Sequence, residues 1–565
     1  MQAVAQDLGH LLGSRDQYVI PRFQRYYEWE STNREKLWND LVEVAFDNQS
    51  NADHFFGAIV AIPTTHQMGQ ITPYLVIDGQ QRLTTVSLLL LALRDIARAK
   101  GHAADAERVE DEFILHKHET GSEHYRLLLR QKDRTAYLQL VDGKPPTTES
   151  NLREAYLDLR QKVEGLISAN ENELETLRAL LRGVTSKFNV VSITLKDENP
   201  FQIFKSLNST GLQLAESDLI RNHVFMNVPL DEVTQGRFEQ DFWDPLERVL
   251  QHTDLDPTMF YRHYLMRNGS YIKDDGVYEG FEAEWSSTNP TPEAKVTEMK
   301  WFAELYRVIL AIDKPEPTTP LDGALGGLGV LRRFGTTTAY PLIMNLAERV
   351  KSGTASRDEL RQCIWAINSF VLRRYVCQEG SRAYSRWFVA AIPGLKDPAS
   401  SSLRQFLKGK GWPSDDRFKE ALRTFALYAG DNSPYAREVL TRLVRSFEPK
   451  DEQVDLSGCE IEHVLPQTIT PGTAEGDAWI AALGGSGWEQ AYWRTVNTLG
   501  NLTLVGKAYN RSVQNSPFTV KQPELVKSIV VMNRYFSGVT EWNESAIVAR
   551  SAVLSDVLVK TFPGP

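Results

Sequence analysis

A carboxylate and an imidazole stand side by side where a short stretch of the chain reaches a proline. The stretch is EIEHVLPQT, residues 460–468, and the pair is Glu462 and His463. The pattern predicts a β-strand that stops at the proline. A strand end followed by a loop is a common place for catalytic side chains, because the scaffold is rigid and the tip is open. The surrounding segments must decide whether this pair does chemistry.

A second group of polar residues follows the predicted strand PYLVIDG at 73–79. Asp78 and Gly79 form a turn, and a strongly apolar helix begins after them with Gln80, Gln81 and Arg82. The N-terminus of a helix favours phosphate, and an arginine adds a bidentate donor. Alternatively, Asp78 caps the helix and Arg82 is solvated, which is the favoured interpretation of this segment alone. No GxxxxGK[ST] motif occurs in the chain, so this is not a P-loop.

Several elements must position these residues. A chain of 565 residues predicts three or four domains. Segments 187–195 and 501–505 are short and β-branched, which predicts strands, whereas 359–379 has helical spacing. We expect an α+β multidomain protein with an α/β N-terminal part, a helical middle and a small α+β C-terminal module. The predicted limits are residues 1–235, 236–447 and 448–565.

Composition excludes several classes of protein. The chain is 42% hydrophobic and 24% charged, which excludes a mostly disordered or collagen-like chain. Its three cysteines form no CxxC pair, so a cysteine-rich zinc site and a disulfide scaffold are excluded. The N-terminus does not resemble a signal peptide, and LLLLAL at 88–93 is too short to span a bilayer. We therefore expect a cytoplasmic protein without a membrane partner. The net charge of −10 argues against a coat on nucleic acid but allows a local basic groove.

Four sequence blocks in the N-terminal part form a recognisable set. They are IPRFQRYYEWE (20–30), FFGAIV (55–60), DGQQR (78–82) and FQIFKSLNSTGLQLAESDLIRNHVF (201–225). In this order they resemble the N-terminal NTPase domain of GmrSD-type and SspE-like restriction proteins, which has a ParB/sulfiredoxin-like fold. The resemblance covers residues 20–225, and DGQQR is its most specific block.

This resemblance implies a nucleotide site for GTP or ATP. The residues expected to line it are Gln24, Arg25, Asp78, Gly79, Gln80, Gln81 and Arg82. Asn208 and Asp218 match the last block, although a turn and a helix start also favour these residue types. The aromatic residues Tyr26, Tyr27 and Trp29 either stack on a base or belong to the core, and the core interpretation is favoured.

The segments around His463 also match a known arrangement. EIEHVLPQ is followed by LGNLTL, which contains Asn501, and by a predicted helix that contains Asn510. This strand, strand and helix order resembles the ββα-metal (His-Me finger, HNH-type) nuclease domain of the same restriction proteins. The resemblance implies that His463 is the general base and that Asn501 holds the loop or the imidazole. It also implies that Glu462 and Asn510 bind Mg²⁺ or Mn²⁺, with Asn510 ranked first because many such enzymes have the shorter Asp before the histidine.

Charge along the C-terminal module changes sign. Residues 451–493 contain eight acidic residues and no Lys or Arg, whereas 494–534 contain six basic residues and one acidic residue. The resulting +5 stretch (6 − 1) predicts a surface that contacts phosphates, with a solvated helix face as the alternative. A smaller basic segment, 126–134, is interpreted as a solvated helix face. Arg373 and Arg374 either bridge domains or cover a surface.

The two resemblances imply a nucleotide-dependent restriction endonuclease that cuts chemically modified double-stranded DNA in defence against phage. One alternative is a DNA-modification sensor with a vestigial nuclease, and another is a nuclease that binds nucleotide without turnover. The modification, such as a glucosylated base or a sulfur-substituted backbone, is not specified by the sequence, and a homodimer is compatible with it.

Overall fold

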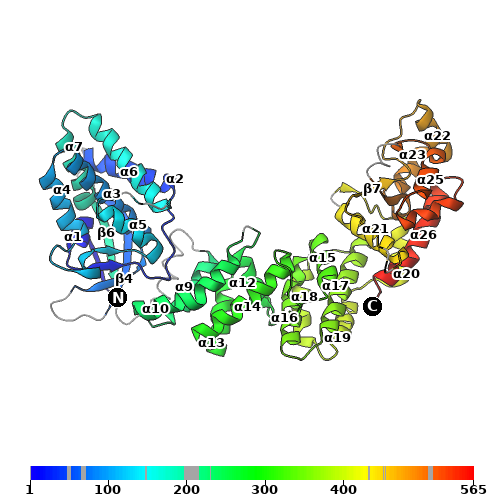
Figure 1. Ribbon diagram of the computed structural model, residues 1–565, viewed down its shortest axis with the longest axis horizontal. Coiled ribbons are helices and arrows are strands. Elements are labelled where there is room, and N and C mark those ends of the chain that lie inside the picture. The colour runs from blue at the N-terminus through cyan, green and yellow to red at the C-terminus, as the bar shows by residue number, and fades with distance from the viewer. Residues whose placement is uncertain are drawn as a thin grey trace. The chain divides into compact units, whose positions relative to one another are not determined.

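The chain forms two compact units in the computed structural model. The structure describes residues 2–46, 53–64, 71–144, 146, 149–195, 215–229, 231–252, 254–317, 319–430, 433–449, 451, 453–506 and 513–565. The first unit comprises Met1–Pro245 and Phe281–Val296, and the second comprises Leu246–Gly280 and Thr297–Pro565. Their elements are labelled in Figure 1.

The first unit is built on a mixed six-stranded sheet. Its strands are β1 (Gln2–Asp7), β2 (Gln17–Val19), β3 (His54–Pro63), β4 (Pro73–Asp78), β5 (Leu127–Leu128) and β6 (Phe188–Thr194). Their order is β1-β6-β3-β4-β2-β5, and both parallel and antiparallel pairs occur. The predicted strands at 73–79 and 187–195 are therefore confirmed as β4 and β6.

The helices of the first unit are α1 (Leu8–Gly13), α2 (Ser31–Phe46), α3 (Gln80–Ala99), α4 (Ala103–Val109), α5 (Gln131–Val141), α6 (Asn151–Ser168), α7 (Glu173–Arg182), α9 (Glu216–Met226) and α10 (Glu232–Phe238). Helix α3 is buried on almost all sides and is strongly apolar in its middle. It packs against α4, α6 and α7, and its side chains join those of the sheet in one core (Figure 1). The N-terminus of α3 is thereby fixed at the end of β4.

The turn between β4 and α3 requires glycine. Gly79 has a φ of 92°, a conformation that residues with a Cβ adopt at a cost. A Cβ at Gly79 would also lie 2.4 Å from Cδ1 of Ile59. Backbone conformation and close packing therefore select the same residue at the entrance to α3.

The second unit is mostly helical and contains one small sheet. Its helices are α12 (Pro257–Met266), α15 (Leu325–Arg333), α16 (Tyr340–Lys351), α17 (Arg357–Val376), α18 (Tyr384–Ala391), α19 (Ala399–Lys408), α20 (Asp415–Thr424), α21 (Ser433–Phe447), α22 (Ala474–Ala482), α23 (Trp488–Thr495), α25 (Phe518–Val526) and α26 (Glu544–Thr561). Helices α11 (Asp244–Leu250), α13 (Val277–Thr288) and α14 (Pro292–Leu310) run across the limits of the units. The helix predicted at 359–379 is confirmed as α17.

The small sheet consists of two antiparallel strands, β7 (Cys459–His463) and β8 (Leu502–Gly506). His463 is the last residue of β7, as the proline after it predicts. Strand β8 begins one residue later than expected, because Asn501 ends a short 3-10 helix before it. The two ends that hold His463 and Asn501 therefore lie together.

Residues 448–565 pack closely with the preceding helices of the second unit. Helices α20 and α21 both contact α26. Arg373 of α17 is fully buried and donates to the carbonyl oxygens of Phe562 and Pro413, at 2.7–3.0 Å. Arg374 is also buried and bonds backbone carbonyls, which corrects the surface interpretation of this pair. The three-domain division at 235 and 447 stays a prediction.

The protein is thus an α+β chain with a mixed sheet, as expected at the level of fold class. Across the described residues, no helix is both long and apolar enough to cross a membrane.

We predict that Gly79→Ala lowers the free energy of unfolding more than Gly101→Ala does. Gly101, just beyond the other end of α3, also has a positive φ of 83°, but nothing lies within 4 Å of its Cβ position. The control therefore contains the backbone cost alone, and the clash at Gly79 should add about 1–3 kcal/mol. Urea denaturation of both variants measures the difference, and equal losses would contradict the steric argument.

Candidate functional site

Two polar residues tie the irregular segment 20–30 to β4 and α3. Gln24 is buried, and its Nε2 donates to the carbonyl oxygen of Ile77 at 2.7 Å. Gln81 donates to the carbonyl oxygen of Tyr26 at 2.9 Å and accepts from the backbone N–H of Glu28 at 3.0 Å. A buried loop needs such partners for its backbone groups. Gln24 and Gln81, both predicted to contact nucleotide, therefore position the loop at the start of α3.

The aromatic residues of this segment contribute mainly to packing. Tyr27 is buried in the core, and its hydroxyl bonds that of Thr85 at 2.9 Å. Trp29 is partly buried against the same core. Tyr26 lies beneath Arg130, whose guanidinium carbon is 3.8 Å from the ring centroid. The favoured core interpretation is thus confirmed for Tyr27 and Trp29.

Arg130 also corrects the interpretation of 126–134 as a solvated helix face. It is 3% exposed and donates to the carbonyl oxygen of Gln24 at 3.1 Å and to Glu239 at 2.8 Å. Arg22 and Arg221 bind the same carboxylate, at 2.7 and 3.0 Å. These arginines hold Glu239 in its charged form and lower its pKa, although burial opposes them. Segment 126–134 therefore contributes a buried arginine that holds the backbone of segment 20–30 at Gln24.

The remaining polar groups at the start of α3 are available to a ligand. No side chain caps the helix, so the interpretation of Asp78 as its cap is wrong. Arg82 donates through Nη1 to the carbonyl oxygen of Ala58 and lies 3.9 Å from Asp78, and it remains 27% exposed. The buried Oε1 of Gln80 has no hydrogen-bond partner in the described part of the chain. The first turn of α3 thus carries uncapped N–H groups, a partly exposed arginine and a buried unpaired acceptor, with Gln80 and Arg82 two residues apart and therefore on different sides of the helix.

Three further residues singled out in the sequence remain. Two of them, Arg25 and Asp218, act on Glu28, and the third lies outside the described residues. Arg25 pairs with Glu28 at 3.1 Å. Burial raises the pKa of Glu28, and the carboxylate of Asp218, in the first turn of α9, raises it further while Arg25 lowers it. Asp218 therefore lies close enough to Glu28 to affect its carboxyl group. Asn208 lies outside the described residues.

The second constellation centres on His463 at the end of β7. Its ring is 7% exposed, and Nε2–H donates to Oδ1 of Asn497 at 3.1 Å. An amide oxygen only accepts, so this shorter contact assigns the proton to Nε2 and leaves Nδ1 unprotonated, and the longer contact of the Gln467 amide nitrogen with the same Nε2 is then not a hydrogen bond. Nε2 of Gln467 is 3.4 Å from the imidazole, and the ring of Tyr428 meets it edge to face at 4.8 Å.

Burial keeps this imidazole neutral. It lowers the pKa of His463 to about 4, and the nearby Lys521 adds to the shift while the Asn497 hydrogen bond opposes it. A neutral imidazole at pH 7 can accept a proton from water, as a general base must. A pKa of about 4 also makes this ring a weaker base than an imidazole that titrates near pH 7, and the general-base role of His463 stays a prediction.

Asn501 is a positioning residue. It is fully buried, and its Oδ1 accepts from the backbone N–H of Leu465 at 2.7 Å and from the indole of Trp542 at 3.0 Å. Its Nδ2 donates to the carbonyl oxygens of Leu465 and Val496 at 2.9 and 2.8 Å. All hydrogen-bonding positions of the amide are occupied. Asn501 therefore holds the loop after His463, one of the two roles that the sequence suggests.

Glu462 is placed differently from its predicted role as a metal ligand. Consecutive residues of a strand point to opposite faces, so Glu462 and His463 diverge. Glu462 is buried and pairs with Nζ of Lys521 at 2.6 Å. Burial raises the pKa of Glu462 and lowers that of Lys521, while their pairing opposes both shifts. The expectation that Glu462 binds a metal beside His463 is therefore corrected: this carboxylate is engaged on the other face.

Among the described residues, no three His, Cys, Asp or Glu side chains converge as a metal-binding cluster. Asn510, ranked first as a ligand, lies outside the described residues, so its role as a metal ligand stays a prediction.

The predicted +5 stretch is largely paired. Lys521 is buried with Glu462, Lys527 pairs with Glu524, and Arg494 pairs with Glu544. Arg534 is exposed, whereas Lys507 and Arg511 lie outside the described residues. Three of the four basic side chains that the structure describes therefore form ion pairs, which argues against a continuous phosphate-binding surface.

Sequence reasoning missed Asn497, Tyr428 and Lys521. Asn497 lies four residues before Asn501 and two residues before the LGNLTL motif, so its amide was a visible signal. Tyr428 comes from a distant segment, and its backbone N–H donates to the carbonyl oxygen of Asn497 at 3.2 Å. Lys521 was counted only as surface charge. No local pattern marks Tyr428 or Lys521 as neighbours of His463.

We predict that His463→Gln weakens the pH dependence of stability between pH 6.5 and 4. The folded pKa is about 4 and the ordinary value is 6.5, so the unfolded chain binds the extra proton within this window. The contribution to stability is complete above pH 6.5 and is lost as pH falls, by up to about 1.4 kcal/mol per pH unit. Urea denaturation of both proteins at pH 7, 6 and 5 measures it. Parallel curves for wild type and variant would contradict the neutral imidazole.

Two protein-family models match this chain. The model for the GmrSD restriction endonuclease N-terminal domain matches residues 8–225, and that for the GmrSD restriction endonucleases C-terminal domain matches residues 412–557. Comparison with curated proteins gives no match. The first matched segment contains the entrance to α3, and the second contains His463 and its neighbours.

Proposed function

Because the chain belongs to the GmrSD restriction endonuclease family, we propose that it is a nucleotide-dependent endonuclease that cuts chemically modified DNA. The proposed biological role is defence against phage. The observation that supports the chemistry best is the neutral imidazole of His463 at a rigid strand end, with an amide oxygen on Nε2 and a basic Nδ1. This arrangement suits HNH-type hydrolysis of a phosphodiester.

In the proposed reaction, Nδ1 of His463 takes a proton from the attacking water. The positive charge that forms on the ring is stabilised by Oδ1 of Asn497, which accepts from Nε2–H. Asn501 keeps the following loop in place through both backbone groups of Leu465. Mg²⁺ or Mn²⁺, if bound, would stabilise charge on the scissile phosphate, and Asn510 is the proposed ligand.

The proposed nucleotide site is the entrance to α3. Its uncapped N-terminus and the exposed part of Arg82 suit the phosphates of GTP or ATP. The unpaired Oε1 of Gln80 offers an acceptor to a hydroxyl or amino group of the ligand. The supporting fold proposed for this unit is ParB/sulfiredoxin-like.

A second candidate is a nuclease that binds nucleotide without turnover. It is favoured by one observation: Gln24 and Gln81 are engaged by the backbone, and Asp78 lies 3.9 Å from Arg82. Few groups at this point are therefore available as a base for hydrolysis. Phosphate release by the purified protein distinguishes the two candidates.

We predict that His463→Ala lowers kcat for DNA cleavage by about 10²–10⁴-fold while nucleotide binding persists, because the general base is lost. The assay uses one duplex in three forms: unmodified, with glucosylated hydroxymethylcytosine, and with phosphorothioate linkages, each with Mg²⁺ and with or without GTP or ATP. His252→Ala, a partly exposed histidine of the second unit, is the control. Cleavage by His463→Ala at the wild-type rate would remove His463 from the mechanism.

We predict that Arg82→Ala weakens nucleotide binding by about 10–100-fold, because charge-assisted hydrogen bonds worth roughly 1.5–3 kcal/mol are lost. Arg98→Ala is the matched control, since Arg98 lies near the other end of α3 and pairs with Glu110. Calorimetry with GTP and ATP measures the affinity, on variants that melt like the wild type. If both variants bind equally well, the entrance to α3 is not the nucleotide site.

A further inference from the structure

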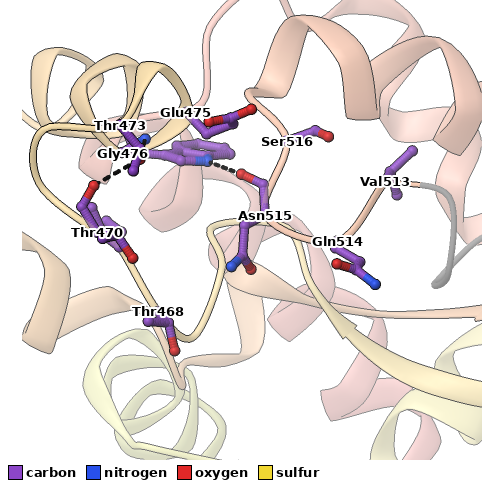
Figure 2. A pocket seen from close by; sticks show the side chains of 11 residues that line it. Thr468, Thr470, Thr473, Glu475, Gly476, Val513, Gln514, Asn515 and Ser516 are labelled. Atoms are coloured by element: carbon purple, nitrogen blue, oxygen red, sulfur yellow. Dashed lines mark hydrogen bonds between the residues drawn. The ribbon is translucent and has the colours of Figure 1, made fainter.

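A cavity of about 420 Å³ opens beside the loop that follows His463. Figure 2 shows Thr468 and Thr470 of this loop on one side and Gln514 and Asn515 on the other. The size falls in the range of ligand-binding clefts. It lies in the nuclease half of the chain and is separate from the entrance to α3.

The walls of the cavity are held by specific contacts. A Cβ at Gly476 would lie 1.9 Å from the carbonyl oxygen of Thr470, so glycine lets α22 pack directly on the loop. The hydroxyl of Thr473 accepts from Gly476 N–H at 3.0 Å and donates to Thr470 at 2.8 Å. The buried indole of Trp479, also in α22, donates to the carbonyl oxygen of Asn515 at 3.1 Å. Specific contacts therefore fix the shape of the cavity.

Five polar side chains line the cavity without protein partners among the described residues: Thr468, Thr470, Gln514, Asn515 and Ser516. Hydroxyls and amides both donate and accept. Within the described lining, the charged residue is Glu475, whose carboxylate disfavours phosphate. A neutral group with many donors and acceptors therefore fits the cavity best, and a nucleobase is such a group.

The cavity is linked to the candidate base through the chain itself. Gln467 lies 3.4 Å from the imidazole of His463, and Thr468, the next residue, lines the cavity. We propose that the cavity binds a nucleobase of the DNA strand being cut, turned out of the duplex beside the scissile phosphate. This inference rests on the proposed endonuclease function and adds its substrate contact. An enzyme that takes a base out of the stack reads its edge by such hydrogen bonds.

The test compares the full chain with the double variant Thr470→Val/Asn515→Ala, which removes two free polar groups and keeps the backbone contacts of the walls. Gln405→Ala, an exposed glutamine of α19, is the control. Cleavage is measured on the three duplexes described above. Binding is measured in the His463→Ala background with the same duplexes containing 2-aminopurine, whose fluorescence rises when the base leaves the stack.

The double variant should raise KM by about tenfold or more, with kcat changed less than about twofold, and should lose the fluorescence rise. An unchanged KM and an unchanged fluorescence rise would overturn the proposal and leave the endonuclease function standing. If the wild type cuts none of the duplexes but gives a fluorescence rise that the double variant lacks, the base-binding cavity stands and the endonuclease proposal falls. Absence of both cleavage and fluorescence change would overturn both.

Discussion

A backbone segment without secondary structure can be buried only if its N–H and C=O groups find partners, and buried amide side chains supply them at both candidate sites. Gln24 binds the backbone of β4 at Ile77, Gln81 binds the backbone of Tyr26 and Glu28, and Asn501 binds both backbone groups of Leu465. The amide groups of these residues are therefore engaged by the protein itself. They hold segment 20–30 and the loop after His463 in one conformation. These loops therefore lose little conformational entropy when a ligand binds.

Burial has a second consequence, because it decides which groups are charged. Glu462 and Lys521 share one buried pair, which joins β7 to α25, and removing either partner would leave an uncompensated charge. On the opposite face of the same strand, burial favours the neutral form of His463. One strand end thus holds a structural ion pair on one side and a neutral base on the other. The separation follows from the alternation of side chains along a strand.

This sequence predicts secondary-structure elements better than it predicts contacts between residues that are far apart along the chain. Gly79 and the apolar run after it suffice to predict where α3 begins, and the proline after His463 marks the end of β7. Alternation along β7 already implies that Glu462 and His463 diverge, a step the family resemblance obscured. The approach of Tyr428 depends on pairing between distant segments, which no local pattern encodes. Charge counting fails for a similar reason: the partners of Lys521 and Arg494 lie 59 and 50 residues away along the chain.

The entrance to α3 combines strong groups for holding a phosphate with few groups for breaking one. Arg82 and the helix N-terminus attract an anion, whereas Gln81, in the same first turn, clamps the segment 24–28. A ligand that binds the first turn of α3 would also affect the contacts of Gln81 with Tyr26 and Glu28, because Gln81 lies in the same turn. Coupling between nucleotide and DNA requires that nucleotide bind two conformations with different affinity, and the coupling is then reciprocal. Gln81 shares this clamp with Arg130, which binds the carbonyl oxygen of Gln24, and with Asp133, which accepts from the backbone N–H of Tyr27, so the segment is held from several elements at once.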